Sequence, residues 1–151
     1  KDVIKIYKIR TMHPFSEFIQ ADVYNQNKLN EKGKIENDFR LTFWGKFLRR
    51  YWIDEIPQFY NLIVGDISLI GPRALSKHYF SIYPKDTQEL RSKIKPGLIP
   101  PYYADMPKNF DEIILSEKNY IEEKRKHPIK TDIIYFFKSV YNILIKGARS
   151  S

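Results

Sequence analysis

The stretch WIDEIPQFYNLIVGDISLIGPRAL, residues 52–75, decides how the middle of this chain folds. Proline is tolerated in the first turn of a helix, and glycine is typical of the position just past a helix end. Pro57 and Gly65 occupy those two places, so residues 55–64 are predicted to form a short helix. An acidic pair stands at the start of this helix, and a basic Gly-Pro-Arg turn follows near the end of the stretch.

The acidic pair, Asp54 and Glu55, has two interpretations. As a structural feature, Asp54 would be the N-cap of the helix and Glu55 would complement the positive end of the helix dipole. As a chemical feature, a carboxylate held at a helix N-terminus is rigid and ionised, which suits a nucleophile or a metal ligand. Adjacent carboxylates can divide these roles, because one can attack phosphorus while the other holds Mg²⁺ on the phosphates. The residues alone leave both interpretations open.

Three segments are predicted on the N-terminal side of this stretch. Residues 3–10 alternate imperfectly between apolar and basic side chains, which predicts a short strand. Residues 25–34 are polar and contain Gly33, which is typical of a surface loop or a mobile segment. From about residue 37 to residue 51, apolar residues recur at spacings of three and four, which predicts an amphipathic helix.

The C-terminal half is predicted to be mostly helical. Asp86 lies three residues before Glu89, a spacing that resembles a capping box at the start of a short helix. Residues 98–107 contain three prolines and are predicted to be extended or turning. A short helix is predicted to begin within residues 85–90 and to end before Pro96, and further helices are predicted over 111–126 and from 131 or 132 to 147. We therefore expect an α+β fold, predominantly helical with a small β element, in a single domain over residues 1–151.

Composition excludes several kinds of site. The chain contains no cysteine and only three scattered histidines, which argues against disulfide frameworks and thiolate or histidine-rich metal sites. Any metal would need oxygen ligands, which favours a hard ion such as Mg²⁺. The apolar runs are far shorter than the roughly 20 residues that a transmembrane helix requires. The net charge of +8 attracts polyanions, among them nucleic acid, anionic lipid and nucleotide diphosphates.

The aromatic residues and the arginines help to decide which of these polyanions the chain binds. The 11 Tyr, 10 Phe and 2 Trp fall mostly at helical core spacing, so core packing is favoured over a base-stacking platform and no nucleic acid is expected. Arg49 and Arg73 are either ordinary surface residues or bidentate ligands of phosphate oxygens. The LIGPR turn lacks the spacing of a Walker loop. Ser68 and Ser76 have no histidine partner in the pattern, which argues against a serine hydrolase.

Several motifs occur in an order that resembles a known family. They are KIRTM at residues 8–12, the segment from FWGKFLRRYWIDE to GPRAL at 43–75, and KIKPGL at 93–98. The segment IKTDIIYFFKSVYNIL, residues 129–144, resembles the closing helix of the same family. The ordered set resembles the catalytic domain of the bacterial sugar transferases, the monotopic polyprenyl-phosphate glycosyl-1-phosphate transferases. An acidic pair by itself would not distinguish this family, whereas the ordered set does.

The resemblance implies a two-step phosphoryl transfer. Asp54, which matches the first residue of the family's acidic dyad, would attack the sugar-bearing phosphorus of a UDP-sugar, release UMP and form a phosphosugar-aspartyl intermediate. Polyprenyl phosphate would then accept the phosphosugar. Glu55, which matches the second dyad residue, would bind Mg²⁺. Four basic residues would hold the phosphates: Arg49, Arg73, Lys8 and Arg10.

The resemblance also implies where the protein acts. Amphipathic helices would lie on the anionic membrane surface, at the cytoplasmic face of the bacterial inner membrane. The chain itself would be a fragment that lacks an N-terminal membrane anchor. Two departures from the family pattern are visible. Ala74 replaces the second proline of a Pro-Arg-Pro turn, and residues 98–109 replace a segment that ends in Asn-Gly-Arg, with Lys108 near the place of its arginine.

Two other functions stay open on the sequence. The two departures motivate a non-catalytic relative that binds a nucleotide sugar or regulates a transferase. The positive charge alone would also fit a basic module that binds nucleic acid or anionic lipid, with an affinity that falls steeply as salt rises. Release of UMP from a UDP-sugar distinguishes the transferase from both alternatives.

Overall fold

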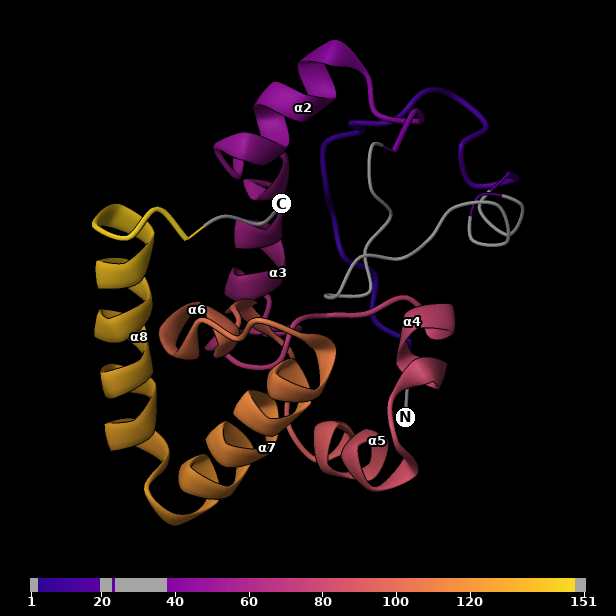
Figure 1. The fold of residues 1–151 in the computed structure, drawn as a ribbon. Helices are drawn as coiled ribbons and strands as arrows, with labels where there is room; N and C mark the ends of the chain where they lie inside the picture. Colours follow the sequence, from indigo (N-terminus) through magenta and orange to yellow (C-terminus); the bar gives the residue numbers. More distant parts are fainter. Residues whose placement is uncertain (1–2, 20–22, 24–37, 149–151) are drawn as a thin grey trace.

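The structure of this chain is a computed structural model that describes residues 3–19, 23 and 38–148. The loop predicted over residues 25–34 lies outside the described residues. The fold is α+β and predominantly helical, as predicted (Figure 1). Its elements are α2 (Phe43–Arg50), the 3-10 turn η1 (Ile53–Glu55), α3 (Gln58–Ile63), β1 (Ser68–Ile70), α4 (Lys77–Ile82), α5 (Lys85–Ser92), β2 (Gly97–Ile99), α6 (Tyr102–Asp105), α7 (Phe110–Lys126) and α8 (Pro128–Leu144).

The small sheet joins two segments that are distant in the sequence. β1 and β2 run parallel, with Ser68 opposite Gly97. The two backbones approach so closely that a Cβ atom added at Gly97 would lie 2.0 Å from the backbone nitrogen of Gly71. An isolated bridge between Arg73 and Gly97 continues the pairing beyond β1. The sheet therefore places the Gly-Pro-Arg turn, residues 71–73, beside the Lys-Pro-Gly segment, residues 95–97.

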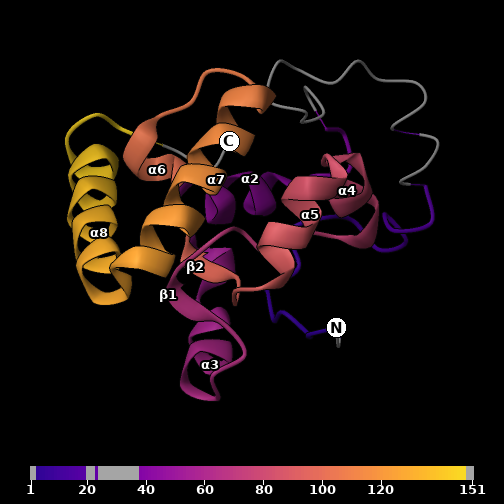
Figure 2. The same ribbon diagram turned by 90° about the horizontal axis from the view of Figure 1, so that it is seen from below.

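The hydrophobic core lies where α7 and α8 pack beside the small sheet (Figure 2). Ile70 of β1 is 1% exposed, and Tyr120 and Ile121 of α7 are fully buried. α7 and α8 meet at a sharp corner because Pro128 begins α8 at its first position. Partly buried residues complete the core: Leu90, Ile94, Ile99, Tyr135 and Phe136.

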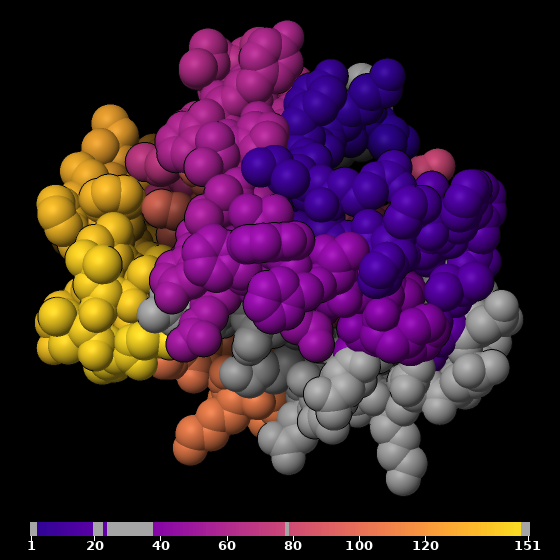
Figure 3. Space-filling model, turned by 90° about the horizontal axis from the view of Figure 1, so that it is seen from above, coloured from indigo at the N-terminus to yellow at the C-terminus, as the bar shows by residue number. Residues whose placement is uncertain are grey.

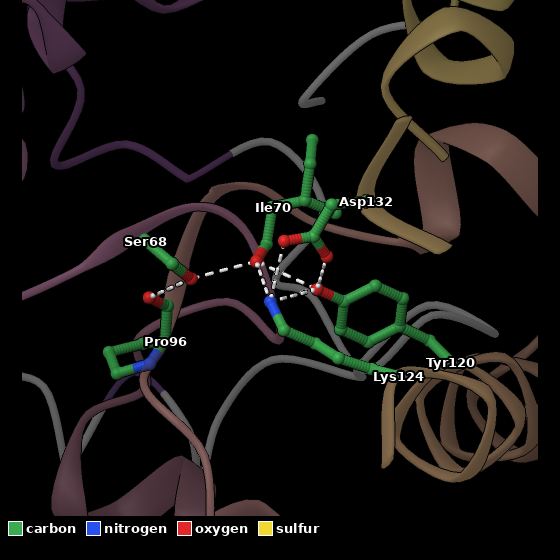
Figure 4. A network of polar contacts seen from close by, with 6 residues as sticks. All are labelled: Ser68, Ile70, Pro96, Tyr120, Lys124 and Asp132. Carbon is green, nitrogen blue, oxygen red and sulfur yellow. Dashed lines mark hydrogen bonds and ion pairs between the residues drawn. The ribbon is translucent and has the colours of Figure 1, made fainter. Parts of the chain in front are cut away.

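A polar network attaches α7 to β1 and to α8 (Figure 4). The Tyr120 hydroxyl lies 2.8 Å from the Ile70 carbonyl oxygen and 2.8 Å from Asp132 Oδ1. Lys124 Nζ donates to the Tyr120 hydroxyl and to Asp132 Oδ2, at 2.9 Å in both cases. Ser68 Oγ donates to the same Ile70 carbonyl at 2.7 Å. These contacts fix the end of β1, which leads into the Gly-Pro-Arg turn.

The strand predicted over residues 3–10 is wrong, because this segment forms no regular element. Its backbone groups bond to residues further along the chain instead of to a neighbouring strand. Ile9 N donates to Asp54 O at 2.9 Å, and the Asn61 side chain bonds two other backbone groups of the segment. The segment is thereby docked against η1 and α3.

Two predicted helices occur with different limits. The helix predicted from about residue 37 begins later, because Thr42 is the N-cap of α2 and its Oγ1 accepts from Gly45 N at 2.8 Å. The helix predicted over residues 55–64 is divided into η1 and the shorter α3. Gly65 follows α3 with φ 80°, which confirms the predicted helix end.

Three predicted helices are confirmed with small shifts. α5 ends at Ser92, before Pro96 as predicted, and α7 covers the predicted residues. α8 begins earlier than predicted, at Pro128, and ends earlier, at Leu144. The capping box predicted for α5 is wrong, since Pro84 is the N-cap and the Asp86 carboxylate accepts from Thr87 N. Residues 98–107 include the one-turn helix α6, so the prediction of extended or turning chain holds for only part of them.

The prediction that the aromatic residues pack in the core is wrong for α2. Phe43 is 81% exposed and Trp44 is 70% exposed, while Phe47 and Tyr51 are about half exposed. Figure 3 shows α2 in purple on one face of the molecule, with the N-terminal segment in indigo on one side and α8 in yellow on the other. No helix in the described part of the chain is long and apolar enough to cross a bilayer. α8 exposes apolar residues of its own: Ile133, Phe137, Leu144 and, just after its end, Ile145.

Candidate active site

The acidic pair lies in η1, and it does not cap a helix. Trp52 is the N-cap of η1, in the left-handed conformation with φ 55°, and Pro57 is the N-cap of α3. Asp54 and Glu55 are both buried, at 6% and 8% exposure. The predicted N-cap role of Asp54 is therefore wrong. Burying an ionised carboxylate costs free energy unless a cation or a hydrogen-bond donor compensates for the lost water. The burial of this pair therefore needs an explanation other than capping.

Two cations hold the Glu55 carboxylate. Lys8 Nζ and Arg73 Nη2 both donate to Glu55 Oε1, at 2.9 Å and 2.6 Å. Burial would raise the pKa of Glu55, but the charges of Arg73 and Lys8 outweigh burial and hold this pKa below its usual range. Glu55 is therefore ionised at physiological pH.

Neighbouring residues hold both the guanidinium group and the backbone of Arg73. Besides the bond to Glu55, its Nη1 donates to the Tyr102 hydroxyl at 3.1 Å. Its backbone carbonyl accepts from Arg91 Nη2, and Arg91 is itself paired with the buried Glu117. Burial opposes the charge of Arg73, but the neighbouring Tyr102 and Glu55 raise its pKa above the value of free arginine. Arg73 is therefore a fixed positive charge beside the dyad.

Arg49 approaches the dyad from the last turn of α2. Its Nε donates to Thr11 Oγ1 at 2.9 Å. Burial lowers the pKa of Arg49, and the negative charge of Asp54 opposes that shift, so the two charges are close enough to interact. Across residues 3–19, 23 and 38–148, no side chain donates a hydrogen bond to the Asp54 carboxylate. Its oxygens are thus uncommitted within that part of the chain.

Lys8 and Arg10 differ in their surroundings. Lys8 reaches Glu55 from the N-terminal segment, and partial burial together with the charge of Arg73 lowers its pKa, although Glu55 opposes this shift. Arg10 is exposed, as Lys8 is, but among the described residues no hydrogen bond or ion pair joins Arg10 to the dyad. The structure therefore brings Lys8 together with Glu55 and Arg73, whereas the phosphate-binding role of Arg10 stays a prediction.

A cavity of about 470 Å³ opens beside Glu55. The basic residues Lys8 and Arg73 are among those that line it. Ala74, which departs from the family's Pro-Arg-Pro turn, also lines the cavity, whereas Asp54 is not one of the described lining residues. A lining that combines cations with aliphatic groups suits a ligand that carries both phosphate and uncharged groups. The larger aliphatic residues in the lining are Val3, Ile4, Ile6, Leu75 and Leu98.

The site fits a divalent cation if the ligand supplies part of the coordination. No group of three or more acidic residues or histidines gathers in the described part of the chain. Both basic side chains bond to Oε1 of Glu55, which leaves Oε2 of that carboxylate without a described partner. Mg²⁺ is usually bound by one or two carboxylates together with substrate phosphates and water. Glu55 can supply one such carboxylate.

Sequence reasoning missed the residues that support the dyad. Trp52 turns the chain into η1, and its Nε1 donates to the Tyr103 hydroxyl at 3.1 Å. Tyr102 supports Arg73, and Arg91 supports the backbone of Arg73. In the sequence, these two tyrosines stand out only as neighbours within residues 98–109, the segment that departs from the family pattern. Nothing in local spacing connects them to partners 29 and 51 residues away.

Comparison with known proteins identifies the relatives of this chain. A family model described as "Bacterial sugar transferase" matches residues 1–146. The chain is 37% identical over 125 residues to the galactosyl transferase CpsE of Streptococcus agalactiae serotype III (strain NEM316), in an alignment that covers 80% of this chain and 28% of CpsE. It is also 37% identical over 97 residues to the UDP-glucose:undecaprenyl-phosphate glucose-1-phosphate transferase of Klebsiella pneumoniae, covering 63% of this chain and 19% of that protein.

A third relative aligns with nearly the whole chain. This is the UDP-N-acetylgalactosamine-undecaprenyl-phosphate N-acetylgalactosaminephosphotransferase of Aeromonas hydrophila, 30% identical over 154 residues, covering 96% of this chain and 33% of that protein. The chain thus spans a third or less of the length of these relatives. Because the family model matches almost every residue, the chain belongs to the bacterial sugar transferase family.

Proposed function

We propose that this chain is the catalytic domain of a phosphoglycosyl transferase, which moves a sugar 1-phosphate from a UDP-sugar to polyprenyl phosphate. The observation that carries the proposal is the buried dyad, in which two cations hold Glu55 while the neighbouring Asp54 carboxylate has no described hydrogen-bond donor. The relatives from Klebsiella pneumoniae and Aeromonas hydrophila, named for phosphosugar transfer to undecaprenyl phosphate, support this class of reaction.

The first step joins Asp54 to the sugar-bearing phosphorus of the UDP-sugar. A carboxylate oxygen of Asp54 forms a bond to this phosphorus, the bond from phosphorus to the bridging oxygen breaks, and UMP leaves with the electron pair. Covalent catalysis of this kind divides one difficult transfer between two large substrates into two easier steps. The burial of Asp54 limits competition from water for the same phosphorus.

The second step regenerates Asp54. A phosphate oxygen of polyprenyl phosphate attacks the same phosphorus, and the bond from phosphorus to the Asp54 oxygen breaks. The products are a polyprenyl diphosphate sugar and the free carboxylate. Because the acceptor is a phosphate that is already ionised, this step requires no general base.

Fixed cations stabilise the charge on the transferring phosphoryl group. Lys8 and Arg73 line the cavity, and Arg49 lies close enough to interact with the charge of Asp54. Preorganised positive charge stabilises the negative charge that develops on phosphoryl oxygens during transfer. Mg²⁺, held by Glu55 and the substrate phosphates, would neutralise further charge on the diphosphate. Arg10 would be a further phosphate-binding residue, as the resemblance to the family implies.

The lipid acceptor requires that the site lie at a membrane surface. The exposed aromatic residues of α2 and the exposed apolar residues of α8 support this placement, since apolar groups exposed together mark interaction surfaces. Helices with one apolar side and basic residues nearby bind the interface of anionic membranes. We assign this surface to the cytoplasmic face of the bacterial inner membrane.

The test measures UMP release by the full-length protein from UDP-glucose, UDP-galactose and UDP-N-acetylgalactosamine in the presence of undecaprenyl phosphate and Mg²⁺. Asp54→Asn is expected to abolish release, and Glu55→Gln is expected to weaken it severely. Glu122→Gln, which changes an exposed carboxylate on α7, is the matched control and should not alter turnover. Normal turnover by Asp54→Asn would refute the mechanism. A wild-type protein that binds UDP-sugars without releasing UMP would favour the non-catalytic alternative.

A further inference from the structure

α6 is a four-residue helix held in place by its neighbours. A single helical turn is not stable in isolation, because its nucleation cost exceeds the gain from its few hydrogen bonds. Asn142 of α8 is 4% exposed and donates from Nδ2 to the carbonyls of Tyr103 and Ala104, at 2.9 Å and 2.8 Å. Two fully buried prolines precede α6 and restrict the chain that enters it. α6 is therefore a well-anchored segment whose side chains have fixed positions.

Tyr103 of α6 contacts the residue that turns the chain into the dyad. Trp52 has φ 55°, a left-handed conformation that is strained for a bulky residue and needs surrounding contacts to persist. Its indole Nε1 donates to the Tyr103 hydroxyl, and the two rings meet edge to face with centroids 6.0 Å apart. Tyr103 is 5% exposed, so water does not readily replace this contact. Because Trp52 is the N-cap of η1, its position sets the orientation of η1 and so of Asp54, two residues later.

Tyr102 of α6 contacts Arg73, the arginine that is bound to Glu55 of the dyad. Its hydroxyl accepts from Arg73 Nη1, while Glu55 accepts from Arg73 Nη2. A guanidinium group is planar, so contacts at both terminal nitrogens define the plane in which it presents its N–H groups. The rings of Tyr102 and Tyr103 lie 4.8 Å apart between centroids, so both contacts come from one packed pair.

We propose that α6 is a positioning element of this site, in which the Tyr103 hydroxyl orients the dyad turn through Trp52 and the Tyr102 hydroxyl orients Arg73. Both tyrosines act through another residue, so they are positioning residues and not catalytic residues. The inference deepens the proposed function, and its kinetic consequences rest on that function. It also gives a role to the segment that departs from the family pattern, since residues 98–109 contain both tyrosines.

The first test needs no activity. The chain of 151 residues contains two tryptophans, and Trp44 is 70% exposed, so the two indole N–H signals in the ¹H–¹⁵N spectrum of this chain, labelled at tryptophan, are readily distinguished by exchange with water. Tyr103→Phe keeps the ring but removes the acceptor of the Trp52 N–H. We expect this variant to shift the Trp52 indole signal and to accelerate its exchange, with the Trp44 signal unchanged. Tyr83→Phe removes the hydroxyl of another buried tyrosine and should leave both signals in place.

The second test uses turnover by the full-length protein. Tyr102→Phe is expected to raise KM for the UDP-sugar on the order of tenfold, because Arg73 then holds the phosphates in a less defined plane. Tyr103→Phe is expected to lower kcat on the order of tenfold with little change in KM, because Asp54 is then misaligned in the transition state. Tyr83→Phe, with its ring stacking on Arg91 retained, should behave as the wild type.

These measurements separate positioning from general stability. A role in stability alone would reduce the folded fraction, so all affected variants would lose kcat in proportion to their melting temperatures and none would change KM. That pattern overturns the inference, as does a Trp52 indole signal that Tyr103→Phe leaves unmoved. If the wild-type protein releases no UMP, the proposed function fails, and the indole measurement still decides whether α6 holds the dyad turn.

Discussion

Removing one partner of the ion pair between Arg91 of α5 and Glu117 of α7 is expected to destabilise the chain strongly. Both side chains are buried, with Arg91 8% exposed and Glu117 1% exposed. Glu117→Leu would leave a buried guanidinium without its counter-charge, and such a loss costs about 3–5 kcal/mol. For a chain of this length each kcal/mol lowers the melting temperature by about 2–4 °C, so we expect a fall of roughly 6–20 °C.

The same two helices provide a matched control. Lys118 of α7 bonds to Asp86 of α5 at 2.6 Å, but this pair is exposed to solvent. Solvent screens exposed ion pairs, so Lys118→Met should change the melting temperature little. The double variant Arg91→Met with Glu117→Leu removes both buried charges and should recover much of the loss, because apolar side chains of similar volume often replace a buried pair without cost.

The assay is thermal unfolding followed by circular dichroism, with urea unfolding of the same variants for the free energies. The reasoning is refuted if Glu117→Leu lowers the melting temperature no more than Lys118→Met does. It is also refuted if the double variant loses as much stability as Glu117→Leu and Arg91→Met, each made alone, lose together, since the cycle would then contain no coupling between the side chains.

Two other predictions concern the sheet and the dyad. Gly97→Ala should cost about 3 kcal/mol or more in urea unfolding, because the new Cβ atom would meet the backbone nitrogen of Gly71; a change below about 1 kcal/mol would show that the strands do not approach as described. The pKa of Glu55 is lowered in the folded state, so its ion pairs contribute stability that is present above the ordinary value of 4.5 and is lost as pH falls through the lowered pKa. Urea unfolding at pH values from about 6 to about 3 should therefore show a weaker acid dependence for Glu55→Gln than for the wild type, and equal dependence would contradict the assignment.

The helices were the most predictable part of the fold. α7 and α8 carry their limits in local sequence, because apolar periodicity defines each helix and Pro128 separates them. The parallel sheet could not be predicted, since each strand has three residues and its pairing depends on a close approach between Gly71 and Gly97. The N-terminal segment alternates as a strand would, but Asn61 bonds its backbone groups in place of a neighbouring strand.

Periodicity also identified an apolar face on α2 without revealing what covers it. We expected that face to enter the core, whereas Phe43 and Trp44 are exposed. Local spacing reports which residues share a face of a helix, and only tertiary structure decides whether the face is buried.

The site was partly predictable. The dyad and Arg73 belong to ordered motifs, and the structure brings Lys8 to Glu55 from the far end of the chain. The supporting contacts of Tyr102 and Tyr103 depend on how α6 packs, which no local pattern encodes.

The central claim is that Asp54 carries the phosphosugar between donor and acceptor. The most direct measurement is the intact mass of the full-length protein after incubation with a UDP-sugar and Mg²⁺ in the absence of polyprenyl phosphate, followed by peptide mapping. The account predicts a mass gain of one phosphosugar, located on Asp54, which disappears when polyprenyl phosphate is added. Transfer of the phosphosugar to the lipid by a protein that never carries this adduct, or an adduct on another residue, would contradict it.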